Sequence, residues 1–180
     1  DLKRVPLDNL AEEVDEFRLN GCCAPDLRLV RPVANAYEAL LRRRGAVDFP
    51  AMLALPLRLL AESPRALRLY RDAFRHVFAD ELQDISPAQY ELLRQLSLEH
   101  RNLVAVGDLA QTLYSHRGAG AAIFQRFRQD FPDARLTALN ENFRSTASIV
   151  ELANRLSEPL SSAEPLCTTN DDGPPPRVHE

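Results

Sequence analysis

The stretch Ala79 to Asp84 reads Ala-Asp-Glu-Leu-Gln-Asp, follows the apolar pair Val77-Phe78, and decides how this chain is interpreted. An apolar strand that ends in adjacent acids is typical of folds that hydrolyse nucleotides. One carboxylate holds Mg²⁺ there and the other prepares the attacking water. In an open parallel sheet, ligands bind beyond the carboxyl ends of the strands. Acids also commonly begin loops, so an isolated Asp-Glu pair does not settle the question.

Charge, hydrophobic content and cysteine count restrict the class of protein to which this acidic motif can belong. The net charge of -4 gives no support to nucleic-acid binding by bulk electrostatics, so any such binding must come from a local arrangement. A hydrophobic content of 45 % can supply a core, and no apolar stretch approaches the roughly 20 residues that a membrane helix needs. Three cysteines match no metal spacing and suit a reducing compartment. We expect a soluble protein without a secretion signal.

The usual phosphate-binding loop is missing. Lys3 is the only lysine, so no Gly-Lys-Ser/Thr sequence can be written here. The chain opens at Asp1 within helical sequence, and its only methionine is Met52. We therefore expect an excised piece whose triphosphate-binding residues lie elsewhere in a longer protein.

The first half of the chain has helical periodicity. Gly45 is placed where one helix could stop, and a second helix is predicted from about Asp48. Ser63 precedes a proline, which is typical of a cap followed by the first position of a third helix. This region is predicted to be all-helical.

From Arg75 onward, the period changes. Three short apolar runs are predicted as strands, each followed by a helical pattern; they are 76–79, 102–106 and 135–139. Ser86 and Ser145 are the predicted caps of two of these helices. Parallel strands joined by helical crossovers are therefore expected. The sequence after Pro159 is rich in turn residues and is interpreted as a linker.

Three ordered motifs carry a specific resemblance. They are 80–84 (Asp-Glu-Leu-Gln-Asp), 106–119 (Val-Gly-Asp-Leu-Ala-Gln-Thr-Leu-Tyr-Ser-His-Arg-Gly-Ala) and 139–145 (Leu-Asn-Glu-Asn-Phe-Arg-Ser). With them the chain resembles superfamily 1 DNA helicases of the UvrD/PcrA/Rep type, in which these segments look like motifs II, III and IV. The likeness covers most of residues 30 to 160.

The resemblance implies roles in ATP hydrolysis for four residues. Asp80 would hold Mg²⁺ through its water shell, and Glu81 would orient or deprotonate the water that attacks the γ-phosphate. Gln111 would sense the γ-phosphate, which suits an amide that can both donate and accept hydrogen bonds. Arg144 would reach the γ-phosphate from a second lobe and stabilise the charge that develops in transfer.

The resemblance also implies contacts with single-stranded DNA and with duplex junctions. Tyr114, His116 and Arg117 fall where this family places aromatic faces against bases and a cation against the backbone. His116 departs from the usual Phe or Trp, so its stacking would be weaker and would depend on protonation. The resemblance also places Leu109-Ala110 in the loop between the nucleotide site and the DNA site, where acidic residues are common in this family.

The predicted fold is α/β: a partial RecA-like P-loop NTPase fold with parallel strands and flanking helices, preceded by an all-helical segment. Residues 1–62 would resemble the end of subdomain 1B, 63–134 lobe 1A with the Walker B and motif III residues, and 135–180 the start of lobe 2A with motif IV and a linker. The parent would be an ATP-dependent DNA helicase and translocase of a family that usually moves 3'-to-5'. The fragment is expected to be inactive by itself, because Mg²⁺ and the γ-phosphate would have too few ligands.

Three alternatives remain open from the sequence. The chain could belong to a related helicase-nuclease subunit, or it could be a degenerate module that binds DNA or protein without hydrolysis. A metal nuclease that uses Asp80, Glu81, Asp84 and Asp108 is the third. That reaction would leave the Gln and Arg motifs unexplained, and the chain offers no accompanying lysine.

Overall fold

The computed structural model describes residues 7–20, 27–111, 119–157 and 164–177, which fall into two compact units. The first unit comprises residues 1–79 and 85–105, and the second comprises 80–84 and 106–180. The elements of the first unit are α1 Leu7–Asn20, α2 Leu27–Arg44, α3 Phe49–Glu62, α4 Pro64–Ala73, β1 Val77–Ala79, α5 Pro87–Ser97 and β2 Leu103–Ala105. Those of the second are the single-turn 3-10 helices η2 Leu82–Asp84 and η3 Leu109–Gln111, with α6 Ala119–Asp130 and α7 Ala147–Ser157.

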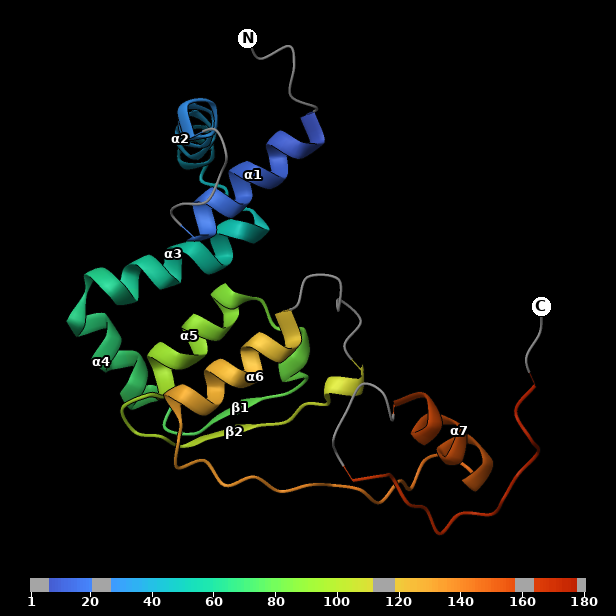
Figure 1. Ribbon diagram of the computed structural model, residues 1–180. Coiled ribbons are helices and arrows are strands. Elements are labelled where there is room, and N and C mark those ends of the chain that lie inside the picture. The colour runs from blue at the N-terminus through green and yellow to red at the C-terminus, as the bar shows by residue number, and fades with distance from the viewer. Residues whose placement is uncertain (1–6, 21–26, 112–118, 158–163, 178–180) are drawn as a thin grey trace. The chain divides into compact units, whose positions relative to one another are not determined.

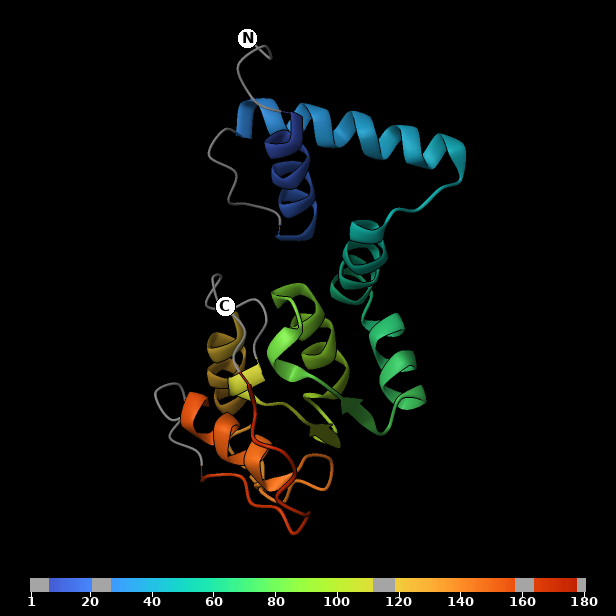
Figure 2. The ribbon, with the colours of Figure 1, turned by 90° about the vertical axis from the view of Figure 1, so that its right-hand side faces the viewer.

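A small apolar core joins α1 to α2, which lie side by side in Figure 2. The buried residues Val14, Val30 and Ala34 form its centre, and partly buried apolar side chains surround them. Gly45 follows the last residue of α2 with a φ of +59°, in the left-handed region where glycine carries no steric penalty. The predicted stop of this helix is therefore confirmed.

A buried arginine ties α1 to the start of α3. The Arg18 guanidinium donates two hydrogen bonds to the Asp48 carboxylate, at 2.7 and 3.0 Å, and lies 5.1 Å from the centre of the Tyr37 ring. Asp48 also accepts the Ala51 backbone N–H at 3.0 Å, so one carboxylate caps α3 and pairs with α1. The hydrogen bonds from Arg18 lower the pKa of Asp48 to about 2.

Local capping explains where two further helices begin. The Ser63 hydroxyl accepts the Ala66 N–H at the start of α4. At the start of α5, Ser86 and Gln89 exchange hydrogen bonds in a capping box, which satisfies two otherwise unpaired donors. Both predicted caps are confirmed.

The sheet consists of two parallel strands, drawn side by side with α5 alongside in Figure 1. Val77 pairs with Leu103 and Ala79 with Ala105, while α5 forms the crossover between the strands. The predicted β-α-β unit is confirmed. The described chain is thus α/β, mostly helical, with a small parallel sheet. Two strands are few for an independent sheet, and Phe78 on β1 remains 76 % exposed.

The third predicted strand, at 135–139, is wrong. This segment lies along the surface with Leu136 and Leu139 about 80 % exposed, and it has no strand partner within the described residues. Just after this segment, Glu141 forms an isolated parallel bridge with Cys167. Apolar composition favoured a strand, but a strand also needs a neighbouring backbone, and the described part of the chain supplies one at the Glu141–Cys167 bridge and not along 135–139.

The predicted cap at Ser145 is wrong, because backbone from the segment after Pro159 takes its place. The interpretation of that segment as a linker stays a prediction. The helix α7 begins at Ala147, whose N–H donates to the Asp171 carbonyl, and the Ser148 N–H donates to the Asp172 carbonyl. Backbone carbonyls from the tail therefore satisfy donors that a serine side chain was expected to cap. Gly173 adopts a φ of +64° where this tail passes Thr146.

Within the described residues, no helix combines the length and the apolar character that crossing a membrane requires.

The Arg18–Asp48 pair predicts that the first unit loses stability in acid. Because the folded pKa of Asp48 is depressed, its contribution is fully present above its unfolded value of about 3.9 and is lost as pH falls toward 2. Burial raises the pKa of Asp15, which opposes this effect. Thermal unfolding followed by circular dichroism should show a flatter response below pH 4 for Asp48→Asn than for the unchanged chain.

At pH 7, Asp48→Asn should lower the free energy of unfolding by about 2 kcal/mol, the size of a lost charge-assisted hydrogen-bonded pair. Glu151→Gln is the matched control, since its pair with Arg155 is exposed and should contribute less than about 0.5 kcal/mol. Equal losses in the two variants would contradict a structural role for the Arg18–Asp48 pair.

Candidate functional site

The candidate site is built on the residues that follow β1 and β2. Since the strands are parallel, their carboxyl ends lie at the same edge of the sheet, and Asp80 and Asp108 follow those ends closely in sequence. The Leu82 N–H donates to the Val106 carbonyl at 2.9 Å, so the two segments remain hydrogen bonded beyond the strands. This is the edge at which ligands bind in open parallel sheets.

Glu81 occupies an unusual backbone conformation. Its φ of +51° is left-handed, which is uncommon for a residue with a side chain and is frequent at functional sites. The Asp80 carboxylate accepts the Glu81 N–H at 3.0 Å, and the Asp84 N–H donates to the Glu81 carbonyl at 2.9 Å. The turn that carries the acid pair is therefore fixed by its own neighbours.

A buried amide links the two segments. Gln83 is 2 % exposed; its Nε2 donates to Glu81 Oε2 at 2.6 Å, and its Oε1 accepts the Asp108 N–H at 3.0 Å. Gly107 leaves room for this side chain, because a Cβ there would lie 2.7 Å from Gln83 Oε1 and 2.9 Å from Phe124 Cζ. Close packing between the loop after β1 and the loop after β2 thus depends on both Gln83 and Gly107.

Asp108 and Gln111 form the second half of the site. The Gln111 side chain donates to Asp108 Oδ2 at 2.7 Å, and the Ala110 N–H donates to Oδ1 at 2.9 Å. Both groups are on η3 or directly before it. The structure therefore brings Glu81, Gln83, Asp108 and Gln111 into one hydrogen-bonded chain.

The donor set fits a magnesium ion that is held mainly by substrate. Asp80 is exposed, and the described residues leave its Oδ2 without a hydrogen bond. Mg²⁺ at phosphate-transfer sites takes one or two carboxylates, with waters and phosphate oxygens completing the shell. No group of three or more His, Cys, Asp or Glu side chains in the described segments could hold a metal, so the four acids of the nuclease alternative do not gather.

Arg144 lies on the segment that precedes α7, and its side chain is exposed. The Asn142 side-chain oxygen accepts the backbone N–H groups of Arg144 and Ser145, at 3.0 and 2.8 Å. This turn fixes the backbone at Arg144, while the part of the chain that the structure describes gives its guanidinium no hydrogen bond or ion pair. Whether Arg144 meets the acid pair stays a prediction.

The predicted DNA-contacting residues Tyr114, His116 and Arg117 lie outside the described residues. Their roles therefore stay predictions from the resemblance. Sequence reasoning did not assign a role to Gln83, although its position between two acids in an otherwise apolar and acidic stretch was a usable signal.

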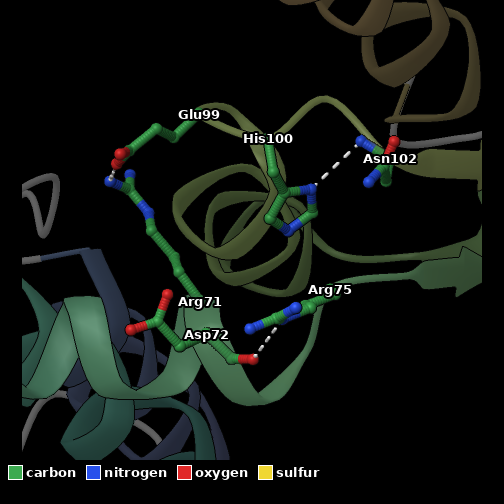
Figure 3. A pocket seen from close by; sticks show the side chains of 6 residues that line it. All are labelled: Arg71, Asp72, Arg75, Glu99, His100 and Asn102. Carbon is green, nitrogen blue, oxygen red and sulfur yellow. Dashed lines mark hydrogen bonds and ion pairs between the residues drawn. The ribbon is translucent and has the colours of Figure 1, made fainter.

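A cavity of about 230 Å³ lies elsewhere, in the first unit (Figure 3). Its lining residues precede the strands instead of following them; they are Arg71, Asp72, Arg75, Glu99, His100 and Asn102. Arg71 pairs with Glu99, and His100 Nδ1 accepts the Asn102 N–H at 3.0 Å, as the dashed lines in Figure 3 show. This cavity is distinct from the acid pair.

The comparison with family models and the comparison with individual proteins indicate the same protein family. Residues 10–132 match the model of the UvrD/REP helicase N-terminal domain. The ATP-dependent DNA helicases PcrA of Staphylococcus epidermidis strain ATCC 12228 and of Staphylococcus aureus strain Mu50 are each 34 % identical over 148 residues. That alignment covers 81 % of this chain and 20 % of each relative, so the chain spans about a fifth of their length.

The contact between Gly107 and Gln83 predicts a costly substitution. Gly107→Ala should lower the free energy of unfolding by about 1–3 kcal/mol, because the added methyl group must displace the hydrogen-bonded Gln83 amide or the Phe124 ring. Urea unfolding of the chain measures this. Gly45→Asn is the control, since nothing lies within 4 Å and asparagine tolerates a left-handed backbone. A Gly107→Ala cost as small as that of the control would show that the packing is not tight.

Proposed function

Because the chain belongs to the UvrD/REP helicase N-terminal domain family, we propose that it is part of the ATP-driven motor of a longer DNA helicase and translocase. The observation that carries this proposal is the hydrogen-bonded chain from Glu81 through Gln83 to Asp108 and Gln111. It joins the acid pair to the predicted γ-phosphate sensor. Relatives of this family are named ATP-dependent DNA helicases.

In this proposal the two acids have different tasks. Asp80 holds Mg²⁺ through its water shell, and the ion would neutralise charge on the β- and γ-phosphates of ATP. Glu81 orients or deprotonates the water that attacks the γ-phosphate, which requires an ionised carboxylate. The turn between the two residues supports this division, because the Asp80 carboxylate accepts the Glu81 N–H and so fixes the backbone that presents Glu81.

Gln111 and Arg144 report on the γ-phosphate and stabilise it. Gln111 now donates to Asp108 Oδ2, so on nucleotide binding its amide would exchange this carboxylate for a phosphate oxygen. Arg144 reaches the same phosphate across a cleft between two lobes, where its guanidinium stabilises the charge that develops in transfer. Closing and opening of that cleft would move the DNA strand.

The DNA partners of the longer protein are single-stranded DNA and duplex junctions, and the direction is 3'-to-5' as the family resemblance implies. Tyr114 and His116 stack on bases, while Arg117 contacts the backbone or a base. Such local contacts would allow DNA binding despite the net charge of -4. The protein would act in the bacterial cytoplasm, associated with the nucleoid.

The architecture that we propose is a partial RecA-like lobe. Residues 1–62 form the end of a helical subdomain 1B, 63–134 form part of lobe 1A, and 135–180 begin lobe 2A. The parallel β1–β2 pair with its helical crossover supports a RecA-like core, since such lobes are built from parallel strands with the nucleotide at their carboxyl ends. The 180 residues alone should show no ATP turnover, because they contain no Gly-Lys-Ser/Thr phosphate loop.

Glu81→Gln in the longer protein should lower the kcat of ATP hydrolysis stimulated by single-stranded DNA by about 10²- to 10⁴-fold, the usual contribution of a general base. The KM for ATP should change little, since Glu81 acts on the water and not on nucleotide binding. Glu62→Gln, at the exposed end of α3, removes the same charge and should leave kcat unchanged. Equal kcat values for Glu81→Gln and the unchanged protein would reject the role of Glu81. Absence of any hydrolysis in the unchanged protein would favour the non-hydrolysing module.

His116→Ala in the longer protein should weaken its binding to single-stranded DNA about fivefold or more, the lower range expected for one stacked base. Fluorescence anisotropy with a labelled oligonucleotide measures the affinity. His76→Ala is the control, since this exposed histidine directly precedes β1. Unchanged affinity in His116→Ala would mean that the imidazole does not stack on a base.

A further inference from the structure

We propose that Gln83 is a positioning residue for ATP hydrolysis: it fixes the carboxylate of Glu81 and links that carboxylate to the loop that carries Gln111. The inference rests on the proposed function, because it assigns a task to Gln83 in that same reaction. It starts from a glutamine that is 2 % exposed and makes hydrogen bonds at both ends of its amide.

The orientation of the Gln83 amide follows from its partners. The Asp108 backbone N–H can only donate, so the atom that faces it at 3.0 Å must be the amide oxygen. The amide nitrogen therefore faces Glu81, whose ionised carboxylate can only accept, at 2.6 Å. Each partner independently requires the same orientation. A flipped amide would place donor against donor and acceptor against acceptor.

No other side chain of similar size meets both requirements. Glutamate at this position could accept the Asp108 N–H but would oppose a second carboxylate to that of Glu81. Methionine fills similar space, yet it leaves a backbone donor and a carboxylate without their partner, which is costly where water is excluded. The glutamine is therefore specified by chemistry as well as by volume.

Gly107 supports the positioning role of Gln83, because it provides the space in which the Gln83 amide lies. A Cβ on Gly107 would come within 2.7 Å of Gln83 Oε1 and within 3.1 Å of Leu82 Cβ. The two loops thus approach each other closely at the point where the amide spans them. Displacement of the Asp108 loop would consequently shift the amide and, through it, the Glu81 carboxylate.

Hydrogen bonds therefore connect Gln111, the proposed γ-phosphate sensor, to Glu81. Gln111 donates to Asp108 Oδ2, the Asp108 N–H donates to Gln83, and Gln83 donates to Glu81. When Gln111 exchanges Asp108 for a phosphate oxygen, the Asp108 loop loses one restraint. The Gln83 amide would then transmit the change to the carboxylate that prepares the water.

A double-mutant cycle in the longer protein tests the proposal. Gln83→Met should lower the DNA-stimulated kcat at least tenfold, with the KM for ATP within twofold. In the Glu81→Gln background, the same substitution should lower kcat less than twofold, because the carboxylate that Gln83 positions is already gone. A residue that merely stabilises the fold would produce similar fold-losses in both backgrounds.

Gln89→Met is the matched control. It replaces a glutamine in α5 that is exposed and engaged in the capping box of that helix, so it should lower the melting temperature without lowering kcat. An unchanged kcat in Gln83→Met, or equal losses in both backgrounds, would overturn the proposal. If Glu81→Gln itself leaves hydrolysis unchanged, the proposed function fails instead, so the two failures are distinguishable.

A measurement without ATP covers the case in which Glu81→Gln is too slow for the cycle. In the 180-residue chain labelled with ¹⁵N-glutamine, the Gln83 side-chain resonance is assigned by its loss in Gln83→Met. It should move on Glu81→Ala, which removes its acceptor, and stay in place on Glu62→Gln. A resonance that does not move on Glu81→Ala would show that the hydrogen bond is absent and would overturn the proposal.

Discussion

The parallel pairing of β1 with β2 is the constraint on which the candidate site depends. Parallel strands place their carboxyl ends at one edge, and a crossover of only one helix, α5, suffices to join them. Acids that are far apart in sequence, such as Asp80 and Asp108, then follow neighbouring strand ends. The backbone bond from Leu82 to Val106 continues this proximity into the loops. The buried amide of Gln83 can span them only because the strands have already set the separation.

Much of the fold was predictable because its signals are local. A cap such as Ser63 or Ser86 acts on backbone donors two or three residues away, so the sequence itself contains both partners. Gly45 likewise needs only its own left-handed backbone. The acid pair was found for a similar reason, since the apolar run and the carboxylates are contiguous. Its chemical role stays a prediction, as do those of Gln111 and Arg144.

The parts that sequence reasoning missed depend on distant partners. The segment 135–139 has strand composition, but pairing needs another backbone, and the nearest bridge joins Glu141 to Cys167. The Arg18–Asp48 pair spans 30 residues, and no periodicity marks it. Gln83 belongs to the same class, because its significance comes from an N–H that lies 25 positions later. Side chains that act between segments are the ones that pattern analysis leaves out.

The tail that was expected to be a linker determines where this polypeptide can be shortened. Carbonyls of Asp171 and Asp172 cover the first donors of α7, and the Asn154 side chain exchanges hydrogen bonds with the backbone of Leu166. Cleavage near Pro159 would separate α7 from the carbonyls that accept its first N–H groups and from the backbone that hydrogen bonds to Asn154. A crystallographer or protein engineer who ends the chain at Pro159 because of its composition would remove the hydrogen bonds that the tail makes to α7.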